Sequence, residues 1–256
     1  MNDESSVATD NFSIPILNRR LGDIARLELS RFGRRRFIAK HDYVFRVGDP
    51  AQCICVVEYG HLKIFEPTAE GRDVLMFIRA PDDILGLRGA LQGDGKGIRT
   101  YSAQACEDTG IVCVPVEKLR PYLETHPKVA LEVAEILARR LNETCEKLSI
   151  LSLSRVPSRV AHLILKIGQC YGTFVGSGVE LNVPFSQQEI ADMVGAARQT
   201  VSGIINELKL DGVISVSQKF IRIQNIEKLK KLALNCCSSE LDARSGMRIL
   251  NKISLR

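Results

Sequence analysis

Residues 186–210, SQQEIADMVGAARQTVSGIINELKL, constrain the fold of this chain more than any other stretch. Ile190, Ala191 and Val194 repeat at helical spacing, and Gly195 then interrupts the pattern. The helical spacing resumes at Val201, Ile204, Ile205 and Leu208. We predict two short helices joined by a tight turn, in which Gly195 supplies the unusual backbone angles. An ordinary buried helical hairpin is the alternative interpretation.

The polar residues of this stretch favour a helix-turn-helix that binds DNA. If the apolar positions pack the second helix onto the first, Arg198, Gln199, Thr200 and Ser202 are free to enter a major groove. Ser186, followed by Glu189 three residues later, predicts a capping box at the start of the first helix.

The size and charge of the chain agree with this prediction. Its 256 residues allow two domains, and the net charge is +5. Residues 155–256 hold 14 Lys and Arg against 8 Asp and Glu, whereas residues 1–154 hold 21 against 22. The basic excess therefore lies beside the helix-turn-helix, where phosphate contacts need it, although a solvated basic face is the alternative.

The chain shows no apolar run long enough to span a bilayer, and its acidic, polar start does not look like a secretory signal. We therefore expect a cytoplasmic protein without membrane contact. The eight cysteines are then expected to be reduced thiols.

The first half of the chain is predicted to be a strand domain. Residues 1–16 are a polar, flexible leader, and residues 17–32 form an amphipathic helix. The cluster Arg34–Arg36 is interpreted as the solvated end of this helix, with a nucleic-acid patch as the alternative. Short strands separated by turn residues follow at 43–45, 54–57, 62–65, 74–78, 84–85, 101–105 and 111–114. This pattern predicts an antiparallel barrel or sandwich, so that 17–125 is a sensory domain.

Residues 126–153 are predicted to be one long helix that mediates dimerisation. Its seam positions alternate in steps of four and three, and they include Leu137, Leu141, Thr144, Leu148 and Leu151. A second stripe, at Val129, Val133 and Ile136, is expected to cover the strand domain. We infer a parallel homodimer; a long helix buried within one chain is the alternative.

Residues 154–234 are predicted to form the DNA-binding domain. The hinge at 154–157 ends in Pro157, which suits the first turn of a helix over 158–171. A hairpin over 172–183 precedes the helix-turn-helix, and strands at 213–216 and 220–223 form a wing with Lys219 at its tip. A closing helix over 226–234 precedes a basic tail, 235–256.

This order of elements resembles the CRP/FNR family of bacterial transcription regulators. The segments QQEIADMVG at 187–195 and RQTVSGIINELKLDGVI at 198–214 are similar to the DNA-binding signature of the family, and ARRLNET at 138–144 to its dimer helix. The resemblance implies an α+β fold: an N-terminal antiparallel β-roll of the cyclic-nucleotide-binding type, a dimerisation helix and a C-terminal winged helix-turn-helix.

By this resemblance, Arg198, Gln199, Ser202 and Gly203 lie where the family reads bases. Arg198 suits guanine and Gln199 suits adenine, whereas Gly203 replaces an Arg of the relatives, so the half-site is expected to differ from the usual one. The positions expected to contact phosphates are Ser186, Gln188, Thr200 and Lys219.

The resemblance also places a candidate effector pocket at Gly86, Leu87, Arg88, Tyr101, Ser102, Thr144 and Cys145. Leu87 stands where cyclic-AMP receptors carry a Glu, and Tyr101 where they carry an Arg that binds the cyclic phosphate. Because this charged phosphate contact is lost, we expect a signal other than cyclic AMP. Arg88 or Arg99 is the alternative phosphate ligand.

Cys113 matches one ligand of the FNR iron–sulfur cluster, but no cysteine precedes Cys53, so an FNR-type cluster is not expected. Cys53 and Cys55 share one face of a strand, and we interpret them as core residues; half of a metal site and a redox pair are the alternatives. Cys145, beside the seam, is the best single redox or ligand candidate. The four histidines form no cluster with carboxylates or cysteines in the sequence, and no cofactor is assigned.

We therefore predict a homodimeric, sequence-specific transcription regulator that reads a near-palindromic site on double-stranded DNA and contacts RNA polymerase. The alternatives are a redox-, haem- or metal-responsive regulator that uses cysteines such as Cys145, and an interaction adaptor that no longer reads DNA. The chain carries no recognisable catalytic motif, so we do not expect an enzyme.

Overall fold

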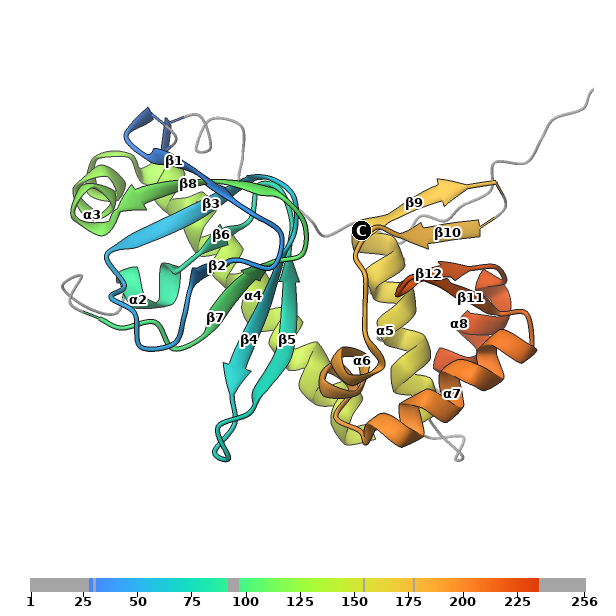
Figure 1. Ribbon diagram of the computed structural model, residues 1–256. Coiled ribbons are helices and arrows are strands. Elements are labelled where there is room, and N and C mark those ends of the chain that lie inside the picture. Colours follow the sequence, from blue (N-terminus) through green and yellow to red (C-terminus); the bar gives the residue numbers. More distant parts are fainter. Residues whose placement is uncertain (1–27, 30, 92–96, 154, 177, 235–256) are drawn as a thin grey trace, which may run out of the picture.

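A computed structural model describes residues 28–29, 31–91, 97–153, 155–176 and 178–234 (Figure 1). The predictions for the leader, for most of the 17–32 helix and for the 235–256 tail lie outside the described residues. A β-roll domain and a winged-helix domain lie side by side, and one long helix runs from the first towards the second (Figure 1). The α+β fold class predicted from the sequence is confirmed.

Two four-stranded antiparallel sheets form the roll, with strand orders β1-β8-β3-β6 and β2-β7-β4-β5. The first comprises β1 (Arg34–Ile38), β8 (Thr109–Pro115), β3 (Cys53–Tyr59) and β6 (Ile84–Leu85). The second comprises β2 (Tyr43–Phe45), β7 (Ser102–Ala105), β4 (Leu62–Pro67) and β5 (Asp73–Arg79). The side chains between the sheets form one apolar core, and the outer face of the first sheet contributes to another.

The interpretation of Arg34–Arg36 as a solvated helix end is wrong. These residues open the edge strand β1, whose residues Arg34 and Arg36 pair with Cys113 and Ile111 of β8. Consecutive arginines show no alternation of period two, which is why the strand was not recognised. Their exposed charges keep this sheet edge from pairing with another chain.

Two helices of the roll were not predicted. The short α2 (Leu87–Leu91) follows β6 directly, and α3 (Val116–Thr125) continues from β8 with Pro121 inside it. Pro121 obscures the helical pattern, because a proline inside a helix removes a backbone hydrogen bond, but Val116 and Leu119 lie one helical turn apart and are both buried.

The long helix is α4 (Pro127–Leu153), close to the predicted bounds. Its stripe at Val129, Val133 and Ile136 packs onto the roll, as predicted, with exposed fractions of 6% or less. The seam stripe remains uncovered in the single chain: Leu141 is 63% exposed and Leu148 is 59% exposed.

The winged-helix domain matches the predicted order of elements. It contains α5 (Val156–Tyr171), β9 (Gly172–Val175), β10 (Gly178–Leu181), α6 (Gln187–Val194), α7 (Arg198–Leu210), β11 (Ile214–Ser217), β12 (Phe220–Ile223) and α8 (Ile226–Leu234). The strands form a third four-stranded antiparallel sheet in the order β11-β12-β10-β9. Pro157 lies in the first turn of α5, where its missing N–H costs no hydrogen bond. Among the described residues, no helix combines the length and apolarity needed to cross a membrane.

Candidate nucleic-acid interface and effector cavity

The two helices of the predicted helix-turn-helix are α6 and α7, and local interactions fix their geometry. The Ser186 hydroxyl accepts a hydrogen bond from the Glu189 N–H (3.2 Å), and the Glu189 carboxylate accepts one from the Ser186 N–H (2.8 Å). This pair is the predicted capping box. Gly195 ends α6 in the left-handed region at φ 60°, where a residue with a Cβ is strained.

Helix α7 divides into a buried and an exposed face. Its apolar residues Val201, Ile204, Ile205 and Leu208 are buried against the rest of the domain. Arg198, Gln199, Thr200 and Gly203 are exposed, and Ser202 is half-buried. No described atom lies within 4 Å of a Cβ built on Gly203, so packing does not require a glycine there. The predicted base-reading residues therefore share one accessible surface.

The wing ends in a two-residue turn, because Ser217 pairs with Phe220. Gln218 (φ 47°) and Lys219 (φ 71°) both adopt the left-handed region, as a type I′ hairpin turn requires. Lys219 is exposed at this tip.

The four predicted phosphate positions differ in availability. Thr200 and Lys219 are exposed. Ser186 already serves the capping box, and the Gln188 amide donates to Asp192 at 2.8 Å. Ser186 and Gln188 therefore already make hydrogen bonds within the protein, which a contact with DNA would have to replace or supplement.

The roll contacts the helix-turn-helix directly through Lys63 of β4. This side chain is buried (8% exposed), and its ammonium donates to the Pro184 carbonyl (2.8 Å) and to the Glu189 carboxylate (2.7 Å). Glu189 thus joins the capping box to the roll. At the tip of the β4–β5 hairpin, exposed Arg72 lies 3.4 Å from Asp192 of α6 and adds a second ion pair.

A cavity of about 400 Å³ lies between the roll and α4. Four of the predicted pocket residues line it: Leu87, Arg88, Tyr101 and Thr144. The remaining walls come from Ile64, Glu66, Phe77, Arg79, Ile84, Leu85, Leu91, Leu137, Arg140 and Leu141. The cavity thus shares Leu137, Leu141 and Thr144 with the predicted dimer seam.

Three predicted pocket residues do not line this cavity. The Gly86 N–H donates to the hydroxyl of Tyr101 (2.8 Å). Gly86 therefore positions a residue of the cavity wall but does not line the cavity itself. The Ser102 hydroxyl instead accepts a hydrogen bond from the Val47 N–H (3.1 Å). Cys145 is exposed on α4 and is not among the residues that line the cavity.

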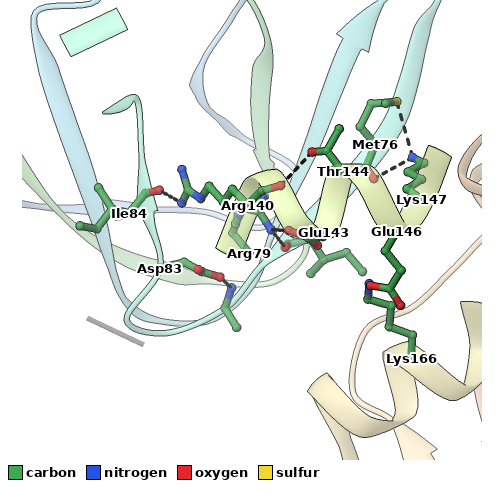
Figure 2. Close-up of polar contacts among 12 residues, drawn as sticks. Met76, Arg79, Asp83, Ile84, Arg140, Glu143, Thr144, Glu146, Lys147 and Lys166 are labelled. Carbon is green, nitrogen blue, oxygen red and sulfur yellow. Dashed lines mark hydrogen bonds and ion pairs between the residues drawn. The ribbon is translucent and has the colours of Figure 1, made fainter. Parts of the chain in front are cut away.

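Polar contacts fasten α4 to β5 and β6 around the cavity, as Figure 2 shows. Arg79 lies 3.4 Å from the Glu143 carboxylate, and Lys147 donates to the Met76 carbonyl at 3.2 Å. Arg140 donates to the Ile84 carbonyl, and its own carbonyl accepts from Thr144 at 2.9 Å.

The arginines around the cavity differ in their electrostatic environment. Burial alone lowers the pKa of Arg79, but the carboxylates of Glu143 and Asp83 outweigh it, and that pKa is raised. Burial and the neighbouring Arg79 lower the pKa of Arg140. Arg88 pairs with Glu66 at 3.5 Å. The cavity therefore has cationic walls whose charges are partly balanced by protein carboxylates.

Ion pairs also cross the hinge between α4 and α5. Glu146 lies 2.5 Å from Lys166 and 3.4 Å from His162. Burial raises the pKa of Glu146, but the hydrogen bond from His162 and the charge of Lys166 outweigh it and lower that pKa to about 2. Arg159 of α5 donates to the Leu151 carbonyl (3.4 Å) and to the Gly195 carbonyl (3.2 Å), which links the end of the seam to the turn between α6 and α7.

Sequence reasoning missed one cluster. Cys53 and Cys55 were interpreted as a pair and Cys113 separately, but the structure brings the three sulfur atoms within 4.8 Å of one another. The sequence carried only part of the signal, the shared strand face of Cys53 and Cys55, because the placement of Cys113 beside Cys55 depends on the register of β3 and β8. Two histidines expected to stand apart from carboxylates pair with one each: His61 with Glu107 (2.6 Å) and His162 with Glu146.

Comparisons with known proteins agree with this architecture. Residues 35–126 match the family model of the cyclic nucleotide-binding domain, and residues 158–232 match that of the Crp-like helix-turn-helix domain. A CRP-like cAMP-activated global transcriptional regulator of Mycobacterium tuberculosis is 31% identical over 190 residues, 74% of this chain and 84% of the relative. The transcriptional activator protein anr of Pseudomonas aeruginosa is 27% identical over 202 residues, 78% of this chain and 80% of that protein.

The solved structure of FixK2 from Bradyrhizobium japonicum has the same fold, with a TM-score of 0.67 at 21% identity, covering 78% of this chain and 96% of that one. A winged helix-turn-helix with an exposed polar second helix, carried by a β-roll and a long helix, defines a DNA-binding transcription regulator. With both domain families matched and a relative above 30% identity, this chain belongs to the CRP/FNR family of transcription regulators.

Proposed function

We propose that the protein acts as a homodimer that reads a near-palindromic promoter site, while its roll senses a signal other than cyclic AMP. In this proposal residues 17–125 form the sensory domain, 126–153 the dimerisation helix and 154–234 the DNA-binding domain. The observation that carries it is that one face of α4 is buried on the roll, whereas the seam face at Leu137, Leu141 and Leu148 is exposed. A second copy of α4 would cover this stripe.

The base contacts in this proposal come from α7. Arg198 donates two hydrogen bonds to a guanine, Gln199 pairs with an adenine, and Ser202 reaches a base edge or a phosphate. Gly203 contributes no side chain, so the base that an arginine would read there goes unread. Thr200, Lys219 and, after rearrangement, Ser186 and Gln188 contact phosphates.

The signal is proposed to act through α4. Leu137, Leu141 and Thr144 belong to both the cavity wall and the seam, so a ligand in the cavity changes the packing of the helix on which dimerisation depends. Arg159 and Glu146 connect the end of α4 to α5 and to the turn between α6 and α7. A ligand that favours one arrangement of these contacts shifts the population of DNA-binding geometries.

Two known signals of the family fit this chain poorly. A cyclic phosphate needs a buried charged donor, but the corresponding residue is Tyr101, whose hydroxyl is engaged by the Gly86 N–H. An FNR-type cluster needs Cys113 to join an N-terminal cysteine group, but its sulfur atom lies beside Cys55 of the adjacent strand at 3.6 Å. Cys145 lies outside the cavity, so we do not assign it the signal.

The proposal includes RNA polymerase as a partner, as for a promoter-bound activator or repressor, in the cytoplasm of a bacterium. It also treats the protein as a regulator without catalytic activity of its own. The protein–DNA contact is the part open to the most direct test.

Selection from a pool of randomised duplexes, followed by binding assays at several salt concentrations, tests the proposal. We expect an enriched, near-palindromic site with half-sites about one helical turn apart, and an affinity that falls steeply with salt. Enrichment of a single half-site would contradict the homodimer. Absence of any enriched sequence, with cell extract present or absent, would contradict DNA reading and favour the interaction adaptor.

A further inference from the structure

The three-cysteine cluster inside the roll has the geometry of a metal site. The sulfur atoms of Cys55 and Cys113 are 3.6 Å apart, and those of Cys53 and Cys55 are 4.0 Å apart. Cys53 and Cys55 are two residues apart on β3, so their side chains lie on the same face of the sheet. Cys113 of the adjacent strand β8 is directly opposite Cys55. The backbone of two paired strands therefore holds the triangle of sulfur atoms in place before any ion binds.

The cluster is sheltered but not sealed. Cys55 is 1% exposed and packs in the core between the two sheets. Cys53 and Cys113 are half-buried, which leaves an entry path from the surface. Among the described residues, no further cysteine, histidine or carboxylate joins the three within 4.8 Å.

The number and kind of ligands select the metal. Thiolates favour Cu(I), zinc and iron–sulfur clusters, but zinc sites and iron–sulfur clusters take four protein ligands in their structural forms. Three sulfur atoms around one ion, with bonds of about 2.3 Å, would be about 4 Å apart. The Cys53–Cys55 and Cys55–Cys113 separations of 4.0 and 3.6 Å are close to this, and the third separation lies within 4.8 Å. We propose that Cys53, Cys55 and Cys113 bind one Cu(I) ion per chain through three sulfur atoms.

Arg99 lies next to this triangle and supplies positive charge. It is 4% exposed, and its guanidinium donates to the Cys53 carbonyl (2.6 Å) and lies 3.4 Å from the Cys53 sulfur atom. Its Nε and Nη1 atoms are buried and have no hydrogen-bond partner among the residues that the structure describes. Each cysteine releases its thiol proton to solvent when it binds the ion, with no transfer of electrons. A Cu(I) trithiolate then carries a net negative charge that Arg99 partly balances.

Arg99 also connects the metal site to the effector cavity. A Cβ built on Gly86 would lie 2.2 Å from the Arg99 Nη1 atom, so the guanidinium packs directly against the residue that precedes α2. Leu87 and Arg88 of α2 line the cavity. Through this packing, copper binding would change the position of α2 and thus the wall of the cavity. The metal site itself does not depend on the proposed DNA reading.

Anaerobic titration of the reduced, full-length protein with Cu(I), against a chromogenic Cu(I) chelator, tests the site. The tail cysteines Cys236 and Cys237 are replaced by serine in every sample, because adjacent thiols also bind copper. We expect one tightly bound ion per chain. Cys53→Ser and Cys113→Ser should each weaken binding by about 100-fold or more, beyond the 10- to 100-fold typical of changes around a metal site.

Matched controls are Cys106→Ser, a buried cysteine outside the triangle, and Cys145→Ser, an exposed one; both should bind copper as the parent protein does. X-ray absorption of the copper-loaded parent should show three sulfur neighbours, a result that does not depend on any variant folding. Unchanged affinity in Cys53→Ser and Cys113→Ser, fewer than three sulfur neighbours, or preferential binding of zinc would overturn the proposal. So would a Cys55–Cys113 disulfide in protein kept under reducing conditions.

Discussion

The DNA-binding domain and the roll differ in how their functional residues are held. In the helix-turn-helix, residues that are close in the sequence supply the cap of α6, the turn at Gly195 and the buried face of α7. Arg198 and Gln199 belong to the exposed face of α7. In the roll, the cavity is formed by residues from β4, β5, β6, α2 and α4 and by Tyr101, which precedes β7, and its arginines are paired with protein carboxylates or carbonyls. The reading surface is therefore local, whereas the sensing surface is a product of tertiary packing.

This difference assigns different roles to α4 and Lys63. The helix serves both regions, because its seam residues also line the cavity. Lys63 crosses directly from the roll to the capping box of α6. Substitutions at these positions should show whether the two regions are coupled or only adjacent.

The largest effect is expected from Leu141→Lys. Burying a leucine contributes about 1.5–3 kcal/mol, twice per symmetric dimer, and a lysine in the seam also adds like charges. We expect a monomer in sedimentation equilibrium, and a loss of about 100-fold or more in affinity for a duplex with two half-sites.

Leu131→Lys is the matched control, because Leu131 is equally exposed on α4 (62%) but lies off the seam. The Leu131→Lys variant should remain dimeric. A dimeric Leu141→Lys protein, or equal loss in both variants, would show that α4 does not dimerise along the predicted seam.

Lys63→Gln should weaken the contact between the roll and α6. Removing one partner of a buried ion pair typically costs about 3–5 kcal/mol, and the partial exposure of Glu189 brings our expectation to about 2–3 kcal/mol. Hydrogen exchange of residues 184–195 should become markedly faster.

The control for Lys63→Gln is Arg72→Gln, which removes an ion pair to the same helix from a side chain that is 60% exposed and should cost less than about 1 kcal/mol. Equal protection of 184–195 in the parent protein and in Lys63→Gln would mean that the two regions are not coupled through Lys63.

Glu146 should make the contact between α4 and α5 dependent on pH. Its pKa is about 2 in the folded protein, below its ordinary value of 4.5, so its stabilising contribution is complete above pH 4.5 and is lost as the pH falls towards 2. Because the side chain is 27% exposed, we expect about 1–3 kcal/mol over this range.

Glu146→Gln should lower the free energy of unfolding at pH 7 and flatten its dependence on pH between 4.5 and 2. Glu135→Gln, at an exposed position of the same helix, should leave both unchanged. If Glu146→Gln retains the parental slope, another group causes the acid sensitivity.

The difference between the two regions also explains what could be predicted from the sequence. The capping box, the Gly195 turn, the wing and the seven roll strands follow from spacing and turn residues within a few positions, and the structure confirms them. Strand β1 was missed because its arginines hide the alternation, and α3 because of Pro121. The cysteine triangle and the Lys63–Glu189 pair required the pairing of β3 with β8 and the docking of two domains, which no local pattern records.

The most direct test of the central claim, that α7 reads bases, is the affinity of Arg198→Ala for the selected site and for random DNA, with Lys219→Ala alongside. We expect Arg198→Ala to lose about 1–3 kcal/mol at the selected site, to lose little on random DNA and to relax base preference at one position. Lys219→Ala should weaken binding uniformly and reduce the salt slope by about one. Equal losses for Arg198→Ala on both kinds of DNA would mean that Arg198 only contacts the backbone, and would contradict the claim.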